Sequence, residues 1–429
     1  MTTPHTARQR LTNIVGGSAG NLVEWFDWYV YAAFALYFAP SFFPKGDQTA
    51  QLMSTAAVFA VGFVMRPIGA WIMGIYADNR GRKAGLTLSV SLMCLGSLAI
   101  AAAPTYAQVG LLSPAVLVIA RMVQGLSLGG EYGSSATYLS EMAGSERRGF
   151  WSSFQYVTLI AGQLLALALL LLLQGIMGEA ELESWGWRIA FALGAVLAIV
   201  VFVIRRRLTE TSHFQQVAAQ GAERQKSSGL NLIKHHPREA LLVVALTAGG
   251  TLAFYAYTTY MQKYLANTVG FDREMASRIM TAALALFMLL QPLAGLLSDR
   301  IGRKPVMIFF GVAGMVLTWP IFTTLETTRD PLTAFGLVMA ALVIVTGYTS
   351  INAVVKAELF PGHIRALGVA LPYAIANTLF GGTAEYVALA LKDAGHERWF
   401  YIYVSVVIGF SLITYATMRD TKRTSLIED

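Results

Sequence analysis

The sequence predicts an all-α membrane protein whose twelve transmembrane helices form two pseudo-symmetric six-helix bundles. Three observations support this fold class. Hydrophobic residues make up 55% of the 429 residues and charged residues only 13%, whereas a soluble protein carries about 25% charged residues. The charges are separated by long apolar runs, and one basic turn occurs twice, about half a chain length apart.

Several uncharged runs are long enough to cross a bilayer, at residues 84–120, 149–178, 240–262 and 331–355. About 20 apolar residues span the hydrocarbon core as a helix. A helix is required because lipid offers backbone polar groups no hydrogen-bond partner. We therefore predict twelve spans, with boundaries accurate to about three residues, at 14–42, 52–77, 85–105, 114–140, 150–177, 187–205, 240–267, 275–297, 306–326, 331–357, 368–391 and 398–418.

One long polar segment lies between the sixth and seventh spans. It divides the chain into an N-terminal bundle (1–205), a cytoplasmic linker (206–238) and a C-terminal bundle (239–429). An even number of spans places both termini on one side. The segments on that side carry 21 of the 32 lysines and arginines, and the opposite loops carry 6. Because basic residues collect on the cytoplasmic side, we predict cytoplasmic termini. The net charge of +7 therefore does not indicate a nucleic-acid partner.

The repeated basic turn indicates an internal duplication. Gly74–Lys83 reads GIYADNRGRK, and Gly295–Lys304 reads GLLSDRIGRK at a constant offset of 221 residues. A second pair of positions agrees, because a glutamate precedes an arginine by seven residues at Glu141 and Arg148 and again at Glu358 and Arg365. Two similar membrane bundles in one chain are the plan of many secondary transporters.

Several kinds of chemistry find no support in the sequence. The lone cysteine, Cys94, cannot form an intramolecular disulfide or a zinc site. None of the six histidines falls within a predicted span, so any proton handling there would use carboxylates. Sequence patterns typical of ATPases, metalloproteases and serine esterases are absent. We therefore expect no enzyme activity, no metal and no cofactor.

Glu24 and Asp27 lie three residues apart on one face of the first span. A charge at the bilayer centre costs about 2.5–3.5 kcal/mol, so such residues need a partner, a cavity or a function. Two nearby carboxylates repel, which favours protonation of one of them. This pair is our predicted proton-coupling site, and the alternative is a structural pair held by a basic residue such as Arg121.

Arg66 lies near the middle of the second span, about 21 Å from its outer end at 1.5 Å per residue. Its planar guanidinium suits a carboxylate. We predict that it binds an anionic ligand, the alternative being permanent pairing with Glu24 or Asp27. Arg121, in the outer half of the fourth span, is the predicted switching partner of Asp27 and a second candidate for the ligand.

Other residues inside the spans are also candidates. Small residues that follow Arg121 permit close helix approach or a hinge, at Gly125, Gly129 and Gly130. Lys263 could meet an anion in the second bundle or extend to the outer interface. Lys356 lies near the inner end of its span, and we expect it to anchor there at the membrane interface.

The basic turns are predicted to hold an inner gate shut. Each places an aspartate at the end of a helix that is directed towards the cytoplasm, followed by two cations, which can bridge neighbouring helix ends. The gating set is Asp78, Arg82, Lys83, Asp299, Arg303 and Lys304, together with Glu141, Arg148, Glu358 and Arg365. The alternative is that these charges only set the topology.

The doubled G-x-x-x-D-x-x-G-R-K turn, with six spans on each side of a basic loop, resembles the major facilitator superfamily along the whole chain. The first turn departs from the family pattern, because Tyr76 stands where leucine is usual and Asn79 where a cation is usual. The resemblance implies transport by alternating access.

Longer and more specific sequence segments resemble the metabolite:proton symporter family, whose members carry α-ketoglutarate, citrate, shikimate or the osmolytes proline and betaine. The segments that carry the resemblance are GNLVEWFDWYVY, FVMRPIGAW, RMVQGLSLGGEYG and SFQYVTLIAGQLLA. FYAYTTYMQKYLANT, YTSINAVVKAELFP and FGGTAEYVALALK are most similar to the α-ketoglutarate carriers of this family. Gln163 and Tyr255, which lie in these segments, complete the predicted substrate-binding set of Arg66, Arg121 and Lys263.

The resemblance implies uptake of a dicarboxylate, with protons as the coupling ion, by a monomer in a bacterial inner membrane. A dianion needs at least one buried cation. Arg66 is the best placed, and Arg121 and Lys263 are candidates for a second carboxylate. A symporter for another metabolite remains an alternative, such as citrate, shikimate or a zwitterionic osmolyte, as does a membrane receptor that binds the anion without moving it.

Overall fold

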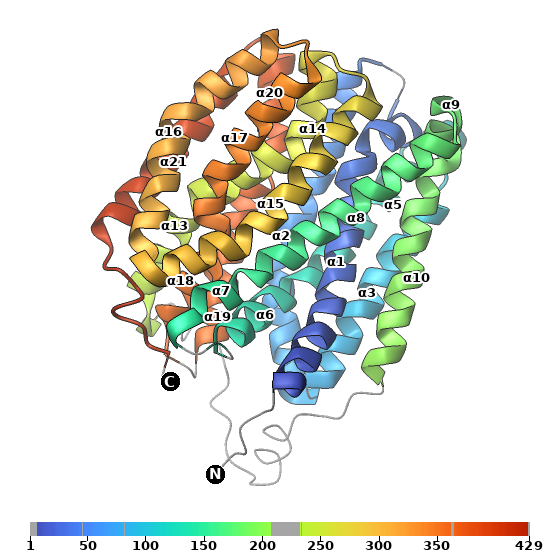
Figure 1. Cartoon of the computed structure of the whole chain (residues 1–429). Coiled ribbons are helices and arrows are strands. Elements are labelled where there is room, and N and C mark those ends of the chain that lie inside the picture. Colours follow the sequence, from blue (N-terminus) through green and yellow to red (C-terminus); the bar gives the residue numbers. More distant parts are fainter. Residues whose placement is uncertain are drawn as a thin grey trace.

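A computed structural model of the protein describes residues 7–44, 46–80, 82–141, 143, 145–206, 232, 234–361 and 364–427. The described side chains exclude those of residues 7–20, 74, 75, 77–80, 82–86, 134, 138, 141, 145 and 204–206. Figure 1 shows long helices packed side by side.

Every predicted span coincides with a helical segment, which confirms the fold class. The first six segments are α1 (Ala7–Phe42), α2 (Gln48–Arg80), α3 (Arg82–Ala102), α5 (Leu112–Gly129) with α6 (Glu131–Glu141), α7 (Arg148–Ser152) with α8 (Phe154–Ile176), and α10 (Trp187–Arg206). Short turns connect them, namely α4 (Tyr106–Val109), η1 (Ser145–Arg147), α9 (Glu179–Glu181) and η2 (Leu182–Gly186).

The second half repeats this plan with several interrupted helices. Its segments are α13 (Pro237–Tyr255) continued by η3 (Ala256–Tyr260), α14 (Met261–Tyr264) and η4 (Leu265–Val269), then α15 (Arg273–Ile301), α16 (Arg303–Thr327), α17 (Pro331–Thr349) with α18 (Asn352–Glu358), α19 (Arg365–Ala376) with η5 (Asn377–Gly381) and α20 (Ala384–Asp393), and α21 (Arg398–Thr417). The turns η3, η4 and η5 are π-helical, an irregularity that is frequent at functional sites.

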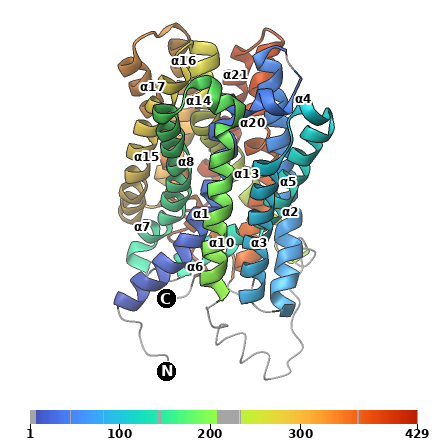
Figure 2. The same ribbon diagram turned by 90° about the vertical axis from the view of Figure 1, so that its right-hand side faces the viewer.

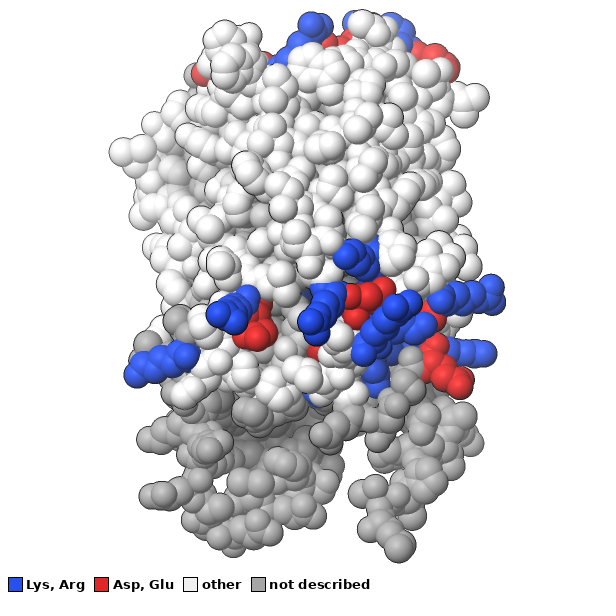
Figure 3. Space-filling view, turned by 90° about the vertical axis from the view of Figure 1, so that its left-hand side faces the viewer, with Lys and Arg blue, Asp and Glu red and all other residues white. Residues whose placement is uncertain are grey.

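The helices are apolar enough to lie in a membrane. Nine helical segments of the described chain are long and hydrophobic enough to cross one. Large hydrophobic side chains are exposed on the outside, including Leu293, Val316 and Phe410. Figure 3 shows a broad uncharged band between charged residues at the two ends of the molecule. Such a surface would be unfavourable in water and suits lipid.

The start of α1 and the segment after α21 lie at the same end of the molecule, together with α6, α7 and α19 (Figures 1 and 2). We call this the inner end, following the charge bias of the sequence, and the opposite end the outer end. The two halves contact each other through α7 and α8 against α15, α6 against α19, and α2 against α20. Most of the predicted linker 206–238 lies outside the described residues, so the domain boundaries remain a prediction.

Glycine at the second basic turn has a conformational reason. Gly302 separates α15 from α16 and has φ 99°, a region that residues with a side chain rarely adopt. The chain reverses there, so Asp299 at the end of α15 lies beside Arg303 at the start of α16. A turn of this shape requires glycine at this position of the repeated pattern.

Candidate functional site

Helices α2 and α5 approach closely because both present glycine at their contact. A Cβ atom added at Gly125 would meet the backbone oxygen of Gly62, and one at Gly129 would meet the backbone oxygen of Arg66. This confirms the close helix approach predicted from the small residues after Arg121. The backbone contact brings the two arginines of these helices towards α1.

Arg66 and Arg121 stack on the same indole ring. The guanidinium carbon of Arg66 lies 4.2 Å from the ring centre of Trp28, and that of Arg121 lies 3.9 Å from it. Arg66 also lies 4.0 Å from the ring of Phe63, and Arg121 lies 4.4 Å from the ring of Tyr31. Cation–π contacts compensate part of the cost of burying a guanidinium.

The two guanidinium groups keep unused hydrogen-bond donors. Arg66 is 3% exposed and Arg121 is fully buried. Within the described chain, Nε and Nη2 of both side chains have no hydrogen-bond partner, and no carboxylate forms an ion pair with either. Buried donors without a partner are costly. The arrangement can therefore accept an anion between aromatic walls.

Asp27 is held inside the first bundle. Its carboxylate accepts hydrogen bonds from Ser97 of α3 and, at 2.7 Å, from Nε2 of Gln124 of α5. Gly194 of α10 packs so closely that an added Cβ would collide with the Asp27 carboxylate. Arg121 reaches this group indirectly, because its Nη1 donates to Oε1 of Gln124 at 2.8 Å.

The relay through Gln124 was missed by the sequence reasoning, which expected direct pairing of Arg121 with Asp27. The i, i+3 spacing of Arg121 and Gln124 on one helix face was the available indication. Of the other predicted residues, Glu24 and Gln163 are buried, and Tyr255 packs edge-on against Phe63 with ring centres 5.2 Å apart.

The lysines of the second half differ in their partners. Lys263 of α14 forms a buried ion pair with Glu385 of α20, with Nζ and Oε2 2.8 Å apart. Its charge is thus balanced by the protein. Lys356 is also fully buried, so its expected position at the membrane interface is wrong. The reason is that α18 lies between α6 and α19 rather than facing lipid.

Asp299 joins the two halves at the inner end. Its carboxylate accepts hydrogen bonds from the backbone N–H groups of Gly149 and Phe150 in the first turn of α7, each at 2.8 Å. N–H groups at a helix start otherwise lack partners and favour a negative charge. Arg303 donates to Asp299 at 2.7 Å and lies 3.5 Å from the carboxylate of Glu358. These residues form what we call the inner network.

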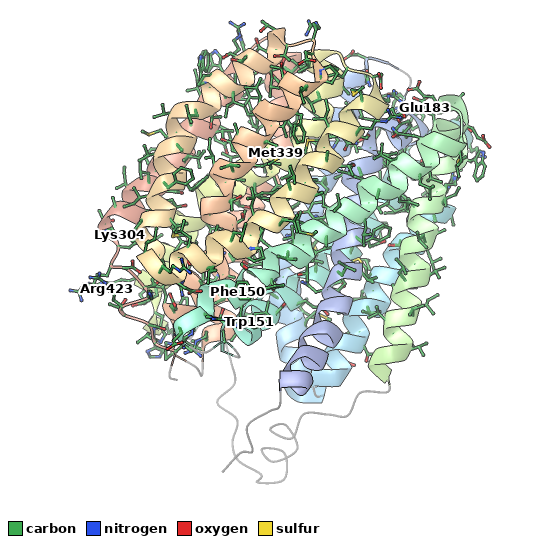
Figure 4. The ribbon with its side chains drawn as sticks, viewed as in Figure 1. Phe150, Trp151, Glu183, Lys304, Met339 and Arg423 are labelled. Atoms are coloured by element: carbon green, nitrogen blue, oxygen red, sulfur yellow. The ribbon has the colours of Figure 1, made fainter. Side chains whose placement is uncertain are left out.

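The chain after α21 adds further contacts to the inner network, which the sequence reasoning did not foresee. Thr421 donates to Glu358 at 2.6 Å, and Lys422 donates to the backbone oxygen of Asp299. Predicted gating residues also bind this tail: Arg148 donates to Ser425, Arg365 donates to the backbone oxygen of Leu426, and the backbone N–H of Lys304 donates to Asp420. Figure 4 shows Lys304 and Arg423 on one side of the inner end and Phe150 and Trp151 nearby.

The first basic turn, Gly74–Lys83, lies largely outside the described side chains. The side chains of its gating residues Asp78, Arg82 and Lys83, and that of Glu141, lie outside the described residues. Their predicted role in the gate remains a prediction.

The outer end is bridged as well. Arg273 at the start of α15 forms an ion pair with Glu183 of η2, which Figure 4 shows far from Phe150 and Trp151. Near the middle of α2, Thr378 of η5 also donates to the backbone oxygen of Phe63, at 2.7 Å. The halves are therefore joined at both ends, and access to the buried arginines requires one end to open.

Comparison with protein families matches residues 18–382, and separately residues 251–427, to the Major Facilitator Superfamily. The chain belongs to this superfamily. The second match begins after the predicted linker, which agrees with the internal duplication. The family resemblance inferred from the sequence is thus confirmed, and the protein is a multi-pass membrane protein of a transporter family.

Curated relatives of this superfamily match nearly the whole chain. The α-ketoglutarate permease of Escherichia coli is 55% identical over 405 residues, which cover 94% of this chain and 93% of the relative. A citrate-proton symporter of Klebsiella pneumoniae is 32% identical and covers 90% of this chain and 86% of its own length. A proline/betaine transporter of Escherichia coli is also 32% identical and covers 95% and 83%.

Among solved structures, the MFS proton:xylose symporter XylE has a similar fold. Bound to 6-bromo-6-deoxy-D-glucose, it superposes with a TM-score of 0.75 at 19% identity and covers 97% of both chains. A partially occluded inward-open conformation of the same transporter gives 0.74 at 18% identity. These relatives and neighbours are transporters and not enzymes.

Proposed function

We propose that the protein imports α-ketoglutarate together with protons by alternating access. The observation that carries this proposal is the pair of buried arginines on Trp28, whose Nε and Nη2 donors have no hydrogen-bond partner in the described chain. The identity of 55% to an α-ketoglutarate permease supports the choice of substrate. Citrate is the second candidate, because citrate-proton symporters are among the more distant relatives.

Arg66 would bind one carboxylate of the substrate in a bidentate contact, and Arg121, which stacks on the same ring of Trp28, would lie close enough to assist. Charge-assisted hydrogen bonds from a guanidinium suit the planar carboxylate. The two guanidinium groups are buried against aromatic rings, so each bond would be stronger than it is in solution. Gln163 and Tyr255 would add polar contacts from α8 and α13.

Proton binding would offset the charge of the substrate. A dianion that enters against a negative-inside potential is opposed by about 2.3 kcal/mol per charge for each 100 mV. Asp27 is a candidate for the proton because Gln124 connects it to Arg121. Substrate that draws Arg121 away from Gln124 would change the hydrogen bonds around Asp27. Glu24, one turn earlier in α1, is the other candidate.

Opening of the inner network would release the substrate to the cytoplasm. In this proposal the protein is a monomer in a bacterial inner membrane with both termini in the cytoplasm, and it uses no cofactor besides the coupling proton. Tags added to each terminus and tested for protease access in spheroplasts and in inverted vesicles would establish the orientation.

The test is uptake of labelled α-ketoglutarate into proteoliposomes with and without an inward proton gradient. We expect accumulation above equilibrium that an uncoupler abolishes, and weak competition by citrate. Equilibration without accumulation would make the protein a uniporter. Stronger competition by citrate than by α-ketoglutarate would favour the second candidate.

The coupling role is tested with Asp27→Asn and Glu24→Gln in the same vesicles. Whichever of the two substitutions removes the proton site should keep exchange of internal for external substrate but lose accumulation driven by the gradient. The substitution of the other carboxylate should keep both exchange and accumulation. If both variants accumulate substrate like the natural protein, neither carboxylate carries the proton.

A further inference from the structure

Lys356 is a buried cation in the second half without a carboxylate partner. It is fully buried, and no ion pair with an acidic side chain is formed by it in the described part of the chain. Its Nζ donates to Oδ1 of Asn352 at 2.7 Å and to the hydroxyl of Tyr132 at 3.3 Å. It also lies 3.9 Å from the ring centre of Tyr373.

These neighbours compensate the charge only in part. An ammonium group has three donors, and neutral oxygens and ring faces stabilise a buried cation less than a carboxylate does. Burying an ammonium without an anion costs several kcal/mol. Lys263 in the same half avoids this cost through Glu385. The position of Lys356 is therefore a cost to folding that a bound anion would remove.

Lys356 lies at the contact between the two halves. Tyr132 comes from α6 in the first half and stacks on Tyr373 of α19 in the second half, with ring centres 3.8 Å apart and planes inclined by 10°. Tyr132 also donates to Asn352 at 3.1 Å. The ammonium group is thus bound by both halves at once.

The helix of Tyr373 connects this position with the helix that carries Arg66. Tyr373 contacts Lys356 through its ring, and its helix α19 packs against α2, to which Arg66 belongs. Arg66 belongs to the first half and Lys356 to the second. An elongated dianion could therefore bridge the halves, with one carboxylate on the guanidinium and the other on the ammonium group.

We propose that Lys356 binds the distal carboxylate of the substrate and thereby selects dicarboxylates over monocarboxylates. This inference rests on the proposed function, since it assigns the second charge of the same ligand. Tyr132 and Asn352 position the ammonium group. Because Tyr132 moves with the first half, its contact with Lys356 also links occupancy of the site to closure of the inner end.

The test compares two ligands that differ only in the distal carboxylate. Binding of α-ketoglutarate and of 2-oxopentanoate, which has the same five carbons, is measured by equilibrium dialysis with purified protein. We expect the natural protein to prefer the dicarboxylate by about 100-fold, the value of one strong charge-assisted hydrogen bond. Lys356→Gln should reduce this preference to within about threefold by weakening only the dicarboxylate.

Lys392→Gln is the matched control. Lys392 lies in α20, is half-buried, and donates to the backbone oxygen of Asn267 and to Thr268, both at 2.7 Å. The same chemical change at this position should leave the preference unchanged. Equal loss of preference in both variants would overturn the proposal.

A second variant separates binding from folding. Lys356→Met removes the buried charge but keeps the apolar stem, so its thermal midpoint should equal or exceed that of the natural protein while the preference is lost. A lower midpoint with the preference intact would show that Lys356 is structural.

Different results would contradict the proposed function and the role of Lys356. If the natural protein binds no α-ketoglutarate, the proposed function is wrong and this inference falls with it. If the natural protein prefers the dicarboxylate and Lys356→Gln keeps that preference, only the assignment of Lys356 is overturned.

Discussion

The inner network and the centre of the protein bury similar cations in opposite ways. At the inner end, Arg303 contacts Asp299 and Glu358, and Asp299 also accepts two backbone hydrogen bonds from the other half. At the centre, Arg66 and Arg121 rest on an aromatic ring and keep donors without a partner in the described chain.

The difference indicates what each region is built to do. Balanced charges stabilise one arrangement of the halves, because removing one partner would leave the other buried and uncompensated. A buried cation without an acidic partner in the protein is stabilised only when an anion binds to it. Substitutions should therefore affect stability where charges are paired, and transport where they are not.

The pair of Lys263 and Glu385 gives the largest expected change in stability. Lys263→Gln leaves Glu385 buried without its cation, and we expect unfolding free energy to fall by about 3–5 kcal/mol. The measurement is thermal unfolding of the purified variant in detergent, followed by the fluorescence of the buried tryptophans.

The double variant Lys263→Gln with Glu385→Gln tests whether pairing is the cause. Two neutral amides can bond each other, so stability should return close to that of the natural protein. Uptake by the double variant then decides the predicted substrate role of Lys263. Normal affinity for the substrate would make the pair structural, and a large loss would place it in the binding site.

Arg66→Gln should affect transport instead. Loss of a bidentate contact between the guanidinium and a carboxylate costs about 3 kcal/mol, which corresponds to a decrease of roughly 100-fold in substrate affinity. The thermal midpoint should not fall, because the variant also removes a buried charge without a carboxylate partner. Both quantities are measured on the same preparation.

Arg188→Gln is the matched control for Arg66. Arg188 donates to the backbone oxygens of Ala101 and Ala103, both at 2.7 Å, so its loss should lower stability and spare substrate affinity. If the two arginine variants show the same pattern, the contrast between cations whose donors are satisfied by the protein and cations with free donors is wrong.

The sequence predicted the helices well because apolar length, charge segregation and duplication are local properties. Each predicted span coincides with a helical segment, and the glycines near Arg121 predicted a close helix approach, which the structure shows between α5 and α2. Gly302 illustrates how far such reasoning extends, since the repeated glycine implied a turn and the structure adds its φ of 99°.

The sequence did not predict which partners meet across helices. Lys356 near a span end was expected at the interface, yet the packing of α18 between α6 and α19 buries it. The position of a residue along its span does not show whether its side of the helix faces lipid. That depends on which helices from other parts of the chain pack against it. For the same reason Gln124 between Arg121 and Asp27 was missed, as was the tail that binds Glu358.

Asp299→Asn should weaken closure of the inner end. The amide keeps one acceptor but loses the charge that binds Arg303 and the start of α7, which costs about 1.5–3 kcal/mol. The closed state would lose population by roughly 10- to 150-fold relative to the open state. Spin labels at Arg147 and Arg300, both exposed and in different halves, would report a longer distance in a Cys94→Ala background.

Glu183→Gln is the control at the opposite end of the molecule, because Glu183 bridges the halves at the outer end through Arg273. This variant should leave the inner labels at their short distance. Lengthening in both variants would mean that the inner distance reports general loosening rather than the inner network.

Thr421→Val gives the smallest expected effect and tests whether the tail takes part in closure. Thr421 is 1% exposed and donates to Glu358 at 2.6 Å. Losing this hydrogen bond costs about 1 kcal/mol, or roughly fivefold in the population of the closed state. Thr424→Val is the matched control, since Thr424 is exposed and donates only to a backbone oxygen of the tail itself. A distance distribution that is the same in both variants would confine closure to the helix ends, and a shift in Thr421→Val alone would make the tail part of the gate.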